Sequence, residues 1–102
     1  MRYLGFITGL LLLTHPVFAA EMSDEERCVK QGEVAEKAAS MRISGVDKDT
    51  ATKTLTRMYD RPGSGVTANN IRGMVMGSYM AKMKPDKMRD HAIAECKKDI
   101  LK

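Results

Sequence analysis

The chain has 102 residues, a formal net charge of +4 at pH 7 from 17 basic and 13 acidic side chains, two Cys and no Trp. That length allows a single domain, close to the lower limit at which a hydrophobic core alone stabilises a fold. Nucleic-acid binding is disfavoured, because it usually needs a stronger basic stripe and stacking aromatic side chains.

The N-terminus has the plan of a secretory signal peptide. Residues 1–3 include one Arg, residues 4–13 are mainly apolar, and residues 17–20 read Val-Phe-Ala-Ala. A basic start, an apolar stretch of about ten residues and an exit of small residues are typical of such a segment. An uncleaved membrane anchor is the alternative, but a span needs roughly 20 apolar residues, and this run is shorter.

We therefore predict a signal peptide over residues 1–19 and a single helical domain over residues 20–102. Cleavage after Ala20 is the neighbouring alternative. Either cut removes Arg2 and lowers the net charge from +4 to +3. The product would be periplasmic or secreted, with no stable membrane span.

The two cysteines, Cys28 and Cys96, both follow the predicted cleavage site. An even number of cysteines in a small exported domain indicates a disulfide. In the chain-entropy model, closing so long a loop stabilises a fold by roughly 4 kcal/mol. Neither residue belongs to a Cys-x-x-Cys motif, so a redox-catalytic or thiol metal site is disfavoured.

A first helix is predicted to begin after Ser23, because Ser23 and Glu26 have the spacing of a capping box. Gly45 supplies a C-terminal stop. Most residues on one face of this helix are small, which would let a neighbouring helix approach closely. That predicted inward face consists of Cys28, Gly32, Ala35, Ala39 and Ile43.

A second helix is predicted to begin after Asp47, a favourable N-cap, with Val46 and Ala51 at the spacing of a weak hydrophobic staple. Residues 60–65 form the clearest loop of the chain, since Pro and Gly are concentrated there. The predicted apolar stripe of the helix consists of Ala51, Leu55, Met58 and Tyr59.

A third helix is predicted from Thr67 through Met83, and its apolar side chains cover more than one face. Such a helix is either central in a bundle or partly exposed to a partner. Gly73 and Gly77 lie about one turn apart, which weakens the helix but permits close packing.

A fourth helix is predicted to begin at Pro85, a residue suited to the first helical position, with Asp86 at the favourable end of the helix dipole. Its inward face recurs every four residues, so Cys96 points inward as Cys28 does. The first and last helices should therefore pair antiparallel. The predicted fold class is all-α: a small bundle of about four helices, with one disulfide joining the first and last. The predicted inward face of the fourth helix consists of Met88, Ala92, Cys96 and Ile100.

Few residues suggest catalysis. His91 is the only histidine beyond the predicted signal peptide, and no Ser lies in a nucleophile-elbow motif. No His and carboxylate cluster has metal-ligand spacing. We therefore expect no enzyme activity and no cofactor.

Methionine is the unusual feature, because five Met residues fall between positions 74 and 88. Three interpretations remain open. Met is an adaptable core filler and is common on pliable binding surfaces, and thioethers also bind soft ions such as Cu(I) and Ag(I). The alternative metal-ligand set is Met76, Met80, Met83, Met88 and His91.

The third helix is the predicted partner site. Arg72 and Lys82 would edge an apolar surface with positive charge and favour an acidic partner. Tyr79 would be the best single anchor, since Tyr is enriched in interface hot spots. The predicted partner-binding residues are Arg72, Met76, Tyr79, Met80 and Met83.

The layout also resembles a group of small exported two-cysteine helical proteins of bacteria that have no defined function. In that group a Cys-bearing first helix leads to an Arg and a Gly, followed by a Tyr-containing helix, a Pro and a closing Cys. The resemblance implies an all-α periplasmic or secreted protein and brings no catalytic or binding residues. The matching positions here are Cys28, Arg42, Gly45, Tyr79, Pro85 and Cys96.

Two functions follow as expectations. The first is a non-catalytic binding protein of the cell envelope, such as an inhibitor, an immunity-type protein, a chaperone-like factor or an accessory subunit. Its partner would be another envelope or secreted protein. The second is a Met-rich periplasmic protein that binds Cu(I) or Ag(I). The sequence leaves the oligomeric state open.

Overall fold

The computed structural model describes residues 22–101, so the predicted signal peptide and its cleavage site lie outside the described residues. Four helices follow one another in this part of the chain, and no strand occurs within it, which confirms the all-α fold class. None of these helices is both long enough and apolar enough to cross a membrane. The helices are α2 (Asp24–Ile43), α3 (Lys48–Tyr59), α4 (Ala68–Ala81) and α5 (Pro85–Ile100).

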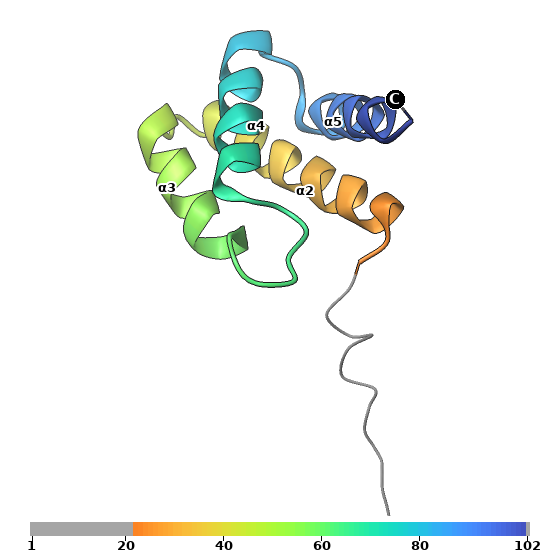
Figure 1. The fold of residues 1–102 in the computed structure, drawn as a ribbon. Coiled ribbons are helices and arrows are strands. Elements are labelled where there is room, and N and C mark those ends of the chain that lie inside the picture. The colour runs from red at the N-terminus through yellow and green to blue at the C-terminus, as the bar shows by residue number, and fades with distance from the viewer. Residues whose placement is uncertain (1–21, 102) are drawn as a thin grey trace, which may run out of the picture.

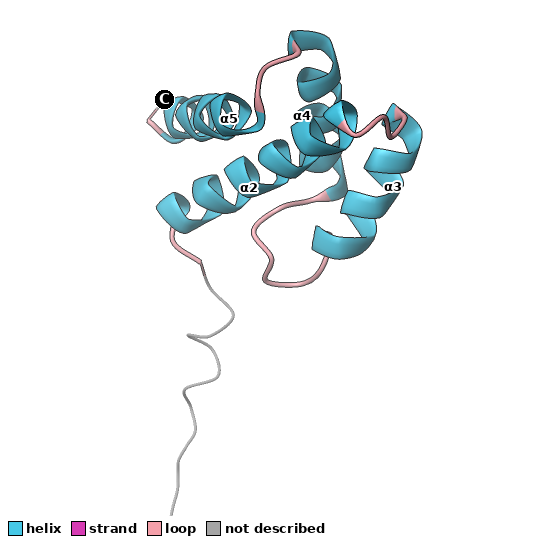
Figure 2. Ribbon diagram, turned by 180° about the vertical axis from the view of Figure 1, so that it is seen from behind, coloured by secondary structure: helices cyan, strands magenta, loops and turns pink. Residues whose placement is uncertain are grey.

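The longest helix, α2, is the centre of the fold and packs against α3, α4 and α5. Figure 1 shows α5 beside α2 on one side and α3 on the other, with α4 crossing between them. The reverse view in Figure 2 gives the same order. The last helix, α5, packs mainly on α2, whereas α4 packs on both α2 and α3. Fewer neighbouring helices therefore hold α5 in place.

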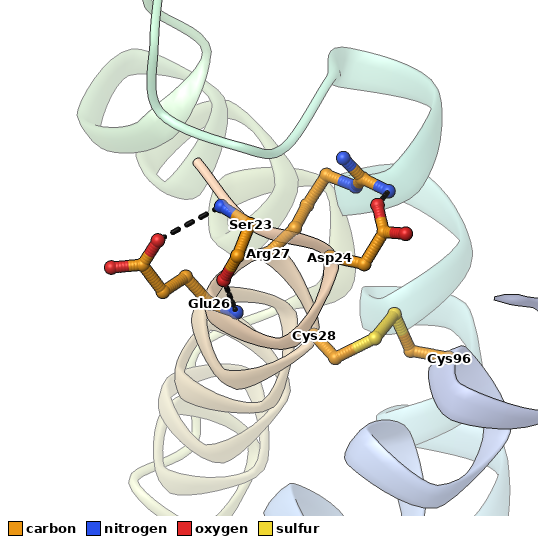
Figure 3. A network of polar contacts seen from close by, with 6 residues as sticks. All are labelled: Ser23, Asp24, Glu26, Arg27, Cys28 and Cys96. Atoms are coloured by element: carbon orange, nitrogen blue, oxygen red, sulfur yellow. Dashed lines mark hydrogen bonds and ion pairs between the residues drawn. A yellow bond between two sulfur atoms is a disulfide. The ribbon is translucent and has the colours of Figure 1, made fainter. Parts of the chain in front are cut away.

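The predicted helix starts are confirmed. Ser23 N–H donates to Glu26 Oε1 at 2.8 Å, and Glu26 N–H donates to Ser23 Oγ at 3.1 Å, as Figure 3 shows. These bonds satisfy backbone donors that the first turn of a helix leaves free. Thr67 and Asn70 form the same reciprocal pair at the start of α4, whereas the Asp47 side chain caps α3 by accepting from the Thr50 amide. Pro85 occupies the first turn of α5.

The larger core lies where α2, α3 and α4 meet. Tyr59 closes one side of it, and its hydroxyl donates to Glu33 Oε2 at 2.8 Å. That hydrogen bond holds the pKa of Glu33 below its usual value. Burial, followed by the bond to Glu33, raises the pKa of Tyr59. The buried residues of this core are Val34, Ala38, Ala51, Leu55, Tyr59, Val66, Ile71 and Val75.

A second, smaller core joins α2 to α5 through Ala35, Ala39 and Met88. Gly32 is buried at the closest approach of these helices, because a Cβ there would lie 2.5 Å from Ile93 Cγ1 and 3.1 Å from the Arg89 carbonyl oxygen. The predicted close packing on small residues of α2 is therefore confirmed.

Gly32→Ala should consequently destabilise the fold by about 1 kcal/mol. Ala favours a helix interior by about 1 kcal/mol over Gly, but overpacking a close contact costs about 1–3 kcal/mol. Gly73→Ala is the matched control, since a Cβ at Gly73 would have no neighbour within 4 Å. That variant should gain about 1 kcal/mol. Urea unfolding measures both; shifts of the same sign would contradict the packing argument.

The predicted disulfide between Cys28 and Cys96 is present, with the two Cα atoms 5.4 Å apart (Figure 3). Cys28 is fully buried on the first turns of α2, whereas Cys96 is half-buried near the end of α5. The bond joins the first and last helices of the described chain. Together with Met88 at the other end, it fixes α5 antiparallel to α2.

Four details of the predicted helices are wrong. Ile100, predicted on the inward face of the fourth helix, is 37 % exposed, because it lies in the last turn of α5, beyond the disulfide. The third helix ends at Ala81 rather than Met83, because Lys82 adopts a left-handed conformation with a φ of 58°. Ile43 is 61 % exposed, because the contacts of α5 along α2 end near Ala39. Met58 is 45 % exposed, since it flanks the buried row of α3.

Candidate protein-binding surface

Two opposite faces of α4 have different surroundings. Ile71, Val75 and Ser78 are buried. The outer face, which we define as Arg72, Gly73, Met76 and Met80, is exposed; Met76 is 47 % and Met80 is 75 % accessible to solvent. One face of α4 is therefore central in the fold, and the opposite face is exposed.

A groove of about 340 Å³ runs beside this outer face, between α3 and α4. Met76 contributes an apolar side chain to it. Its lining includes three cationic side chains and one carboxylate, so the groove has an excess of positive charge. We call it the α3–α4 groove; its lining consists of Lys48, Asp49, Thr52, Lys53, Arg72 and Met76.

The cations of this groove are little neutralised by the protein itself. Lys48 and Lys53 form no ion pair within residues 22–101, and the Arg72 guanidinium donates to the neutral amide oxygen of Asn69. Nearby, Asp47 accepts hydrogen bonds from the Thr50 hydroxyl and amide, which hold the pKa of Asp47 below its usual value. That carboxylate is committed to capping α3.

Tyr79, the predicted anchor, has an internal partner. Its hydroxyl donates to the Val46 carbonyl oxygen at 2.6 Å, and its half-buried ring packs against the larger core. Burial first, and then the charge of Asp47, raise the pKa of Tyr79. The side chain thus fixes the link between α2 and α3, so we do not include it in the outer face.

The Met set divides into two groups. Met88 is buried and Met83 is half-buried, and both pack with Ala35 and Ala39 in the smaller core. Met76 and Met80 remain on the outer face, and His91 is exposed on α5. Within the described residues, no group of three or more His, Cys, Asp or Glu could hold a metal ion.

Arg42 makes the contacts that position the end of α4. Its Nη1 donates to the Ser78 carbonyl oxygen at 2.7 Å, and its Nη2 donates to the Met83 carbonyl oxygen at 2.9 Å. The Ser78 hydroxyl in turn donates to the Ala35 carbonyl oxygen at 3.3 Å. A cation at a helix C-terminus is also favoured by the helix dipole. These bonds tie α4 and the link to α5 firmly onto α2.

Each residue that carries the resemblance to small two-cysteine proteins has a structural task here. The cysteines form the disulfide, and Arg42 and Tyr79 hold the ends of two helices. Gly45 has a φ of 88°, which favours Gly, in the turn after α2. Pro85 starts α5. None of these six residues lies on the outer face of α4.

A second, larger cavity of about 710 Å³ lies among α2, the loop after α3 and the start of α4. Its lining includes Arg27, Arg61 and Asp60. Arg27 is already paired with Asp24, and Asp60 offsets part of the remaining charge. This cavity therefore offers a partner less net charge than the α3–α4 groove does.

Comparisons with protein-family models, curated proteins and solved structures gave no match to this chain.

Proposed function

We propose that the mature chain is a small, exported, non-catalytic binding protein of the cell envelope that uses the outer face of α4 to bind another protein. An inhibitor, an immunity-type protein or an accessory factor fits this description. The observation that carries the proposal is the exposure of Met76 and Met80 beside Arg72 on a helix whose opposite face is buried. Exposed apolar patches with polar rims mark interaction sites, and Met suits pliable binding surfaces.

Two properties of the fold support this role. Disulfides form and persist mainly in oxidising compartments, which agrees with the signal-like pattern of residues 1–19. The outer face also lies on a helix held by Arg42 and by a buried Ser78. A surface that is rigid before binding loses less conformational entropy when the partner arrives.

Site-specific photo-crosslinking in the envelope of the producing cell tests the proposal. A benzoylphenylalanine at Met80 should give a discrete protein adduct, whereas the same group at exposed Glu95 on α5 should not. Met76→Ser should remove the adduct and shift the free energy of unfolding by less than about 0.5 kcal/mol, as for other surface changes. Equal adducts from both positions, or none from Met80, would rule out this face.

Soft-metal binding is the second candidate, because Met76 and Met80 keep exposed thioethers about one helical turn apart. Such ligands prefer Cu(I) and similar ions. Competition against a Cu(I) chelator separates the candidates. Tight one-to-one binding that Met80→Leu abolishes, with the fold intact, would place metal handling first.

A further inference from the structure

We infer that the α3–α4 groove receives an acidic amphipathic helix of the partner, one that carries apolar side chains flanked by Asp or Glu. This inference rests on the proposed function and names the chemistry of its partner. Helices commonly bind by laying an apolar face into a groove. The charge of this groove favours such an occupant, and so do the apolar side chains and the backbone of the adjoining outer face of α4.

Three cations without an ion-pair partner gather around the α3–α4 groove. Four basic side chains elsewhere lie within 4.0 Å of a carboxylate oxygen: Arg27, Lys30, Arg89 and Lys98. The three cations of the groove have no such partner within the described residues. Other cations, such as Arg57, have none either, but those of the groove line a single cavity together. Their positive potential therefore remains available to carboxylates of another molecule, which steers association and sets orientation.

Met76 and Met80 supply exposed apolar side chains next to these cations. Met76 lines the groove, and Met80 follows one turn later on the same face of α4. A partner segment with carboxylates alone would leave both thioether side chains in water. A helix with an apolar stripe between its carboxylates would bury them and meet the cations at the same time.

Gly73 supplies the third argument. It lies inside α4, where Gly weakens a helix relative to Ala, and a Cβ at this position would meet nothing within 4 Å. At Gly32, by contrast, the missing Cβ makes room for Ile93 of α5. The space at Gly73 faces outward beside Arg72 and Met76, so it would admit a close approach from outside the molecule.

Two synthetic helical peptides provide the probes. They share one Leu stripe, which is flanked by Glu in one peptide and by Lys in the other. Fluorescence anisotropy should show the Glu peptide binding at least about tenfold more tightly, with the advantage shrinking at high salt because screening weakens exposed charge interactions. The double variant Lys53→Glu, Arg72→Glu should reverse the preference. Equal affinities, or no effect of the charge reversal, would overturn the inference.

Gly73→Ala tests the close approach independently, because the substitution should raise stability and weaken binding at the same time. The variant should melt at a higher temperature and yet bind the Glu peptide several-fold more weakly. Ser40→Ala, on the exposed side of α2, is the control that should raise the melting temperature and leave binding unchanged. Unchanged binding by Gly73→Ala would overturn the close approach at this residue.

The crosslinking experiment separates a failure of the proposed function from a failure of the acidic-helix inference. A protein adduct from Met80 that survives charge reversal at Lys53 and Arg72 would keep the proposed function and overturn the acidic helix. A Glu-peptide preference without a protein adduct from Met80 would support the groove chemistry and count against the envelope partner.

Discussion

Replacing both Cys28 and Cys96 by Ala should lower the free energy of unfolding by about 4 kcal/mol. The disulfide joins residues 68 positions apart, and closing a loop of that length removes much entropy from the unfolded chain. A domain of this size has a net stability of only about 4–12 kcal/mol. The corresponding fall in melting temperature is roughly 20 °C.

The packing of α5 explains why little else would compensate. Met88 is the only residue of α5 that is buried, and this helix packs mainly against α2. The Arg89–Glu36 ion pair spans 3.5 Å between two side chains that are each more than a third exposed, so it adds little. Without the disulfide, the C-terminal half of α5 should be the first part to separate from α2.

Chemical denaturation of the oxidised protein, the reduced protein and the double Ala variant measures this effect. Ala is preferred to Ser because Cys28 is fully buried and a hydroxyl there would need a hydrogen-bond partner. Dithiothreitol should destabilise the native protein as much as the double substitution does, and should leave the double variant unchanged. A loss below about 1 kcal/mol would show that α5 is held by its packing.

The sequence predicted those parts of the fold that depend on local interactions. An N-cap acts within one turn, so Ser23, Asp47 and Thr67 marked three helix starts correctly. The disulfide was also predictable, since two cysteines allow a single pairing. The small side chains on one face of α2 predicted the close approach of another helix, and α5 makes that approach at Gly32.

The end of α4 could not be read from local pattern. Met83 continues the apolar pattern past Ala81, but Arg42, about 40 positions earlier, holds this end of the helix by donating to two carbonyl oxygens there. Tyr79 is predicted on the surface, but its hydrogen-bond partner Val46 is also distant in the sequence. Successive residues of a helix differ by about 100° in direction, so Tyr79 turns toward Val46 while Met80 points outward.

The exposure of the candidate surface was predictable in part. Arg72, Met76 and Met80 were chosen from the sequence, and the structure places all three on the outer face. Lys48 and Lys53 were missed, because they belong to α3 and meet α4 only after the helices pack. A groove between two helices has no signature in either helix alone, so its charge emerges only from the fold.

Arg42→Ala should lower the free energy of unfolding by about 2 kcal/mol. Hydrogen bonds from a charged donor contribute about 1.5–3 kcal/mol each, but the freed carbonyl groups near the end of α4 can in part bind water instead. The two bonds, of 2.7 and 2.9 Å, hold the last turn of α4 and the link before α5. Amide hydrogen exchange should therefore accelerate first over residues 78–84.

Two comparisons make this prediction specific. Arg42→Lys should recover only part of the loss, because an ammonium lacks the planar fork that reaches both carbonyl oxygens. Arg57→Ala, at an exposed position on α3 with no ion pair among the described residues, should shift stability by less than about 0.5 kcal/mol. Equal effects of Arg42→Ala and Arg57→Ala would show that α4 keeps its position without these bonds. In that case the rigidity of its outer face would have to come from the buried Ile71 and Val75 alone.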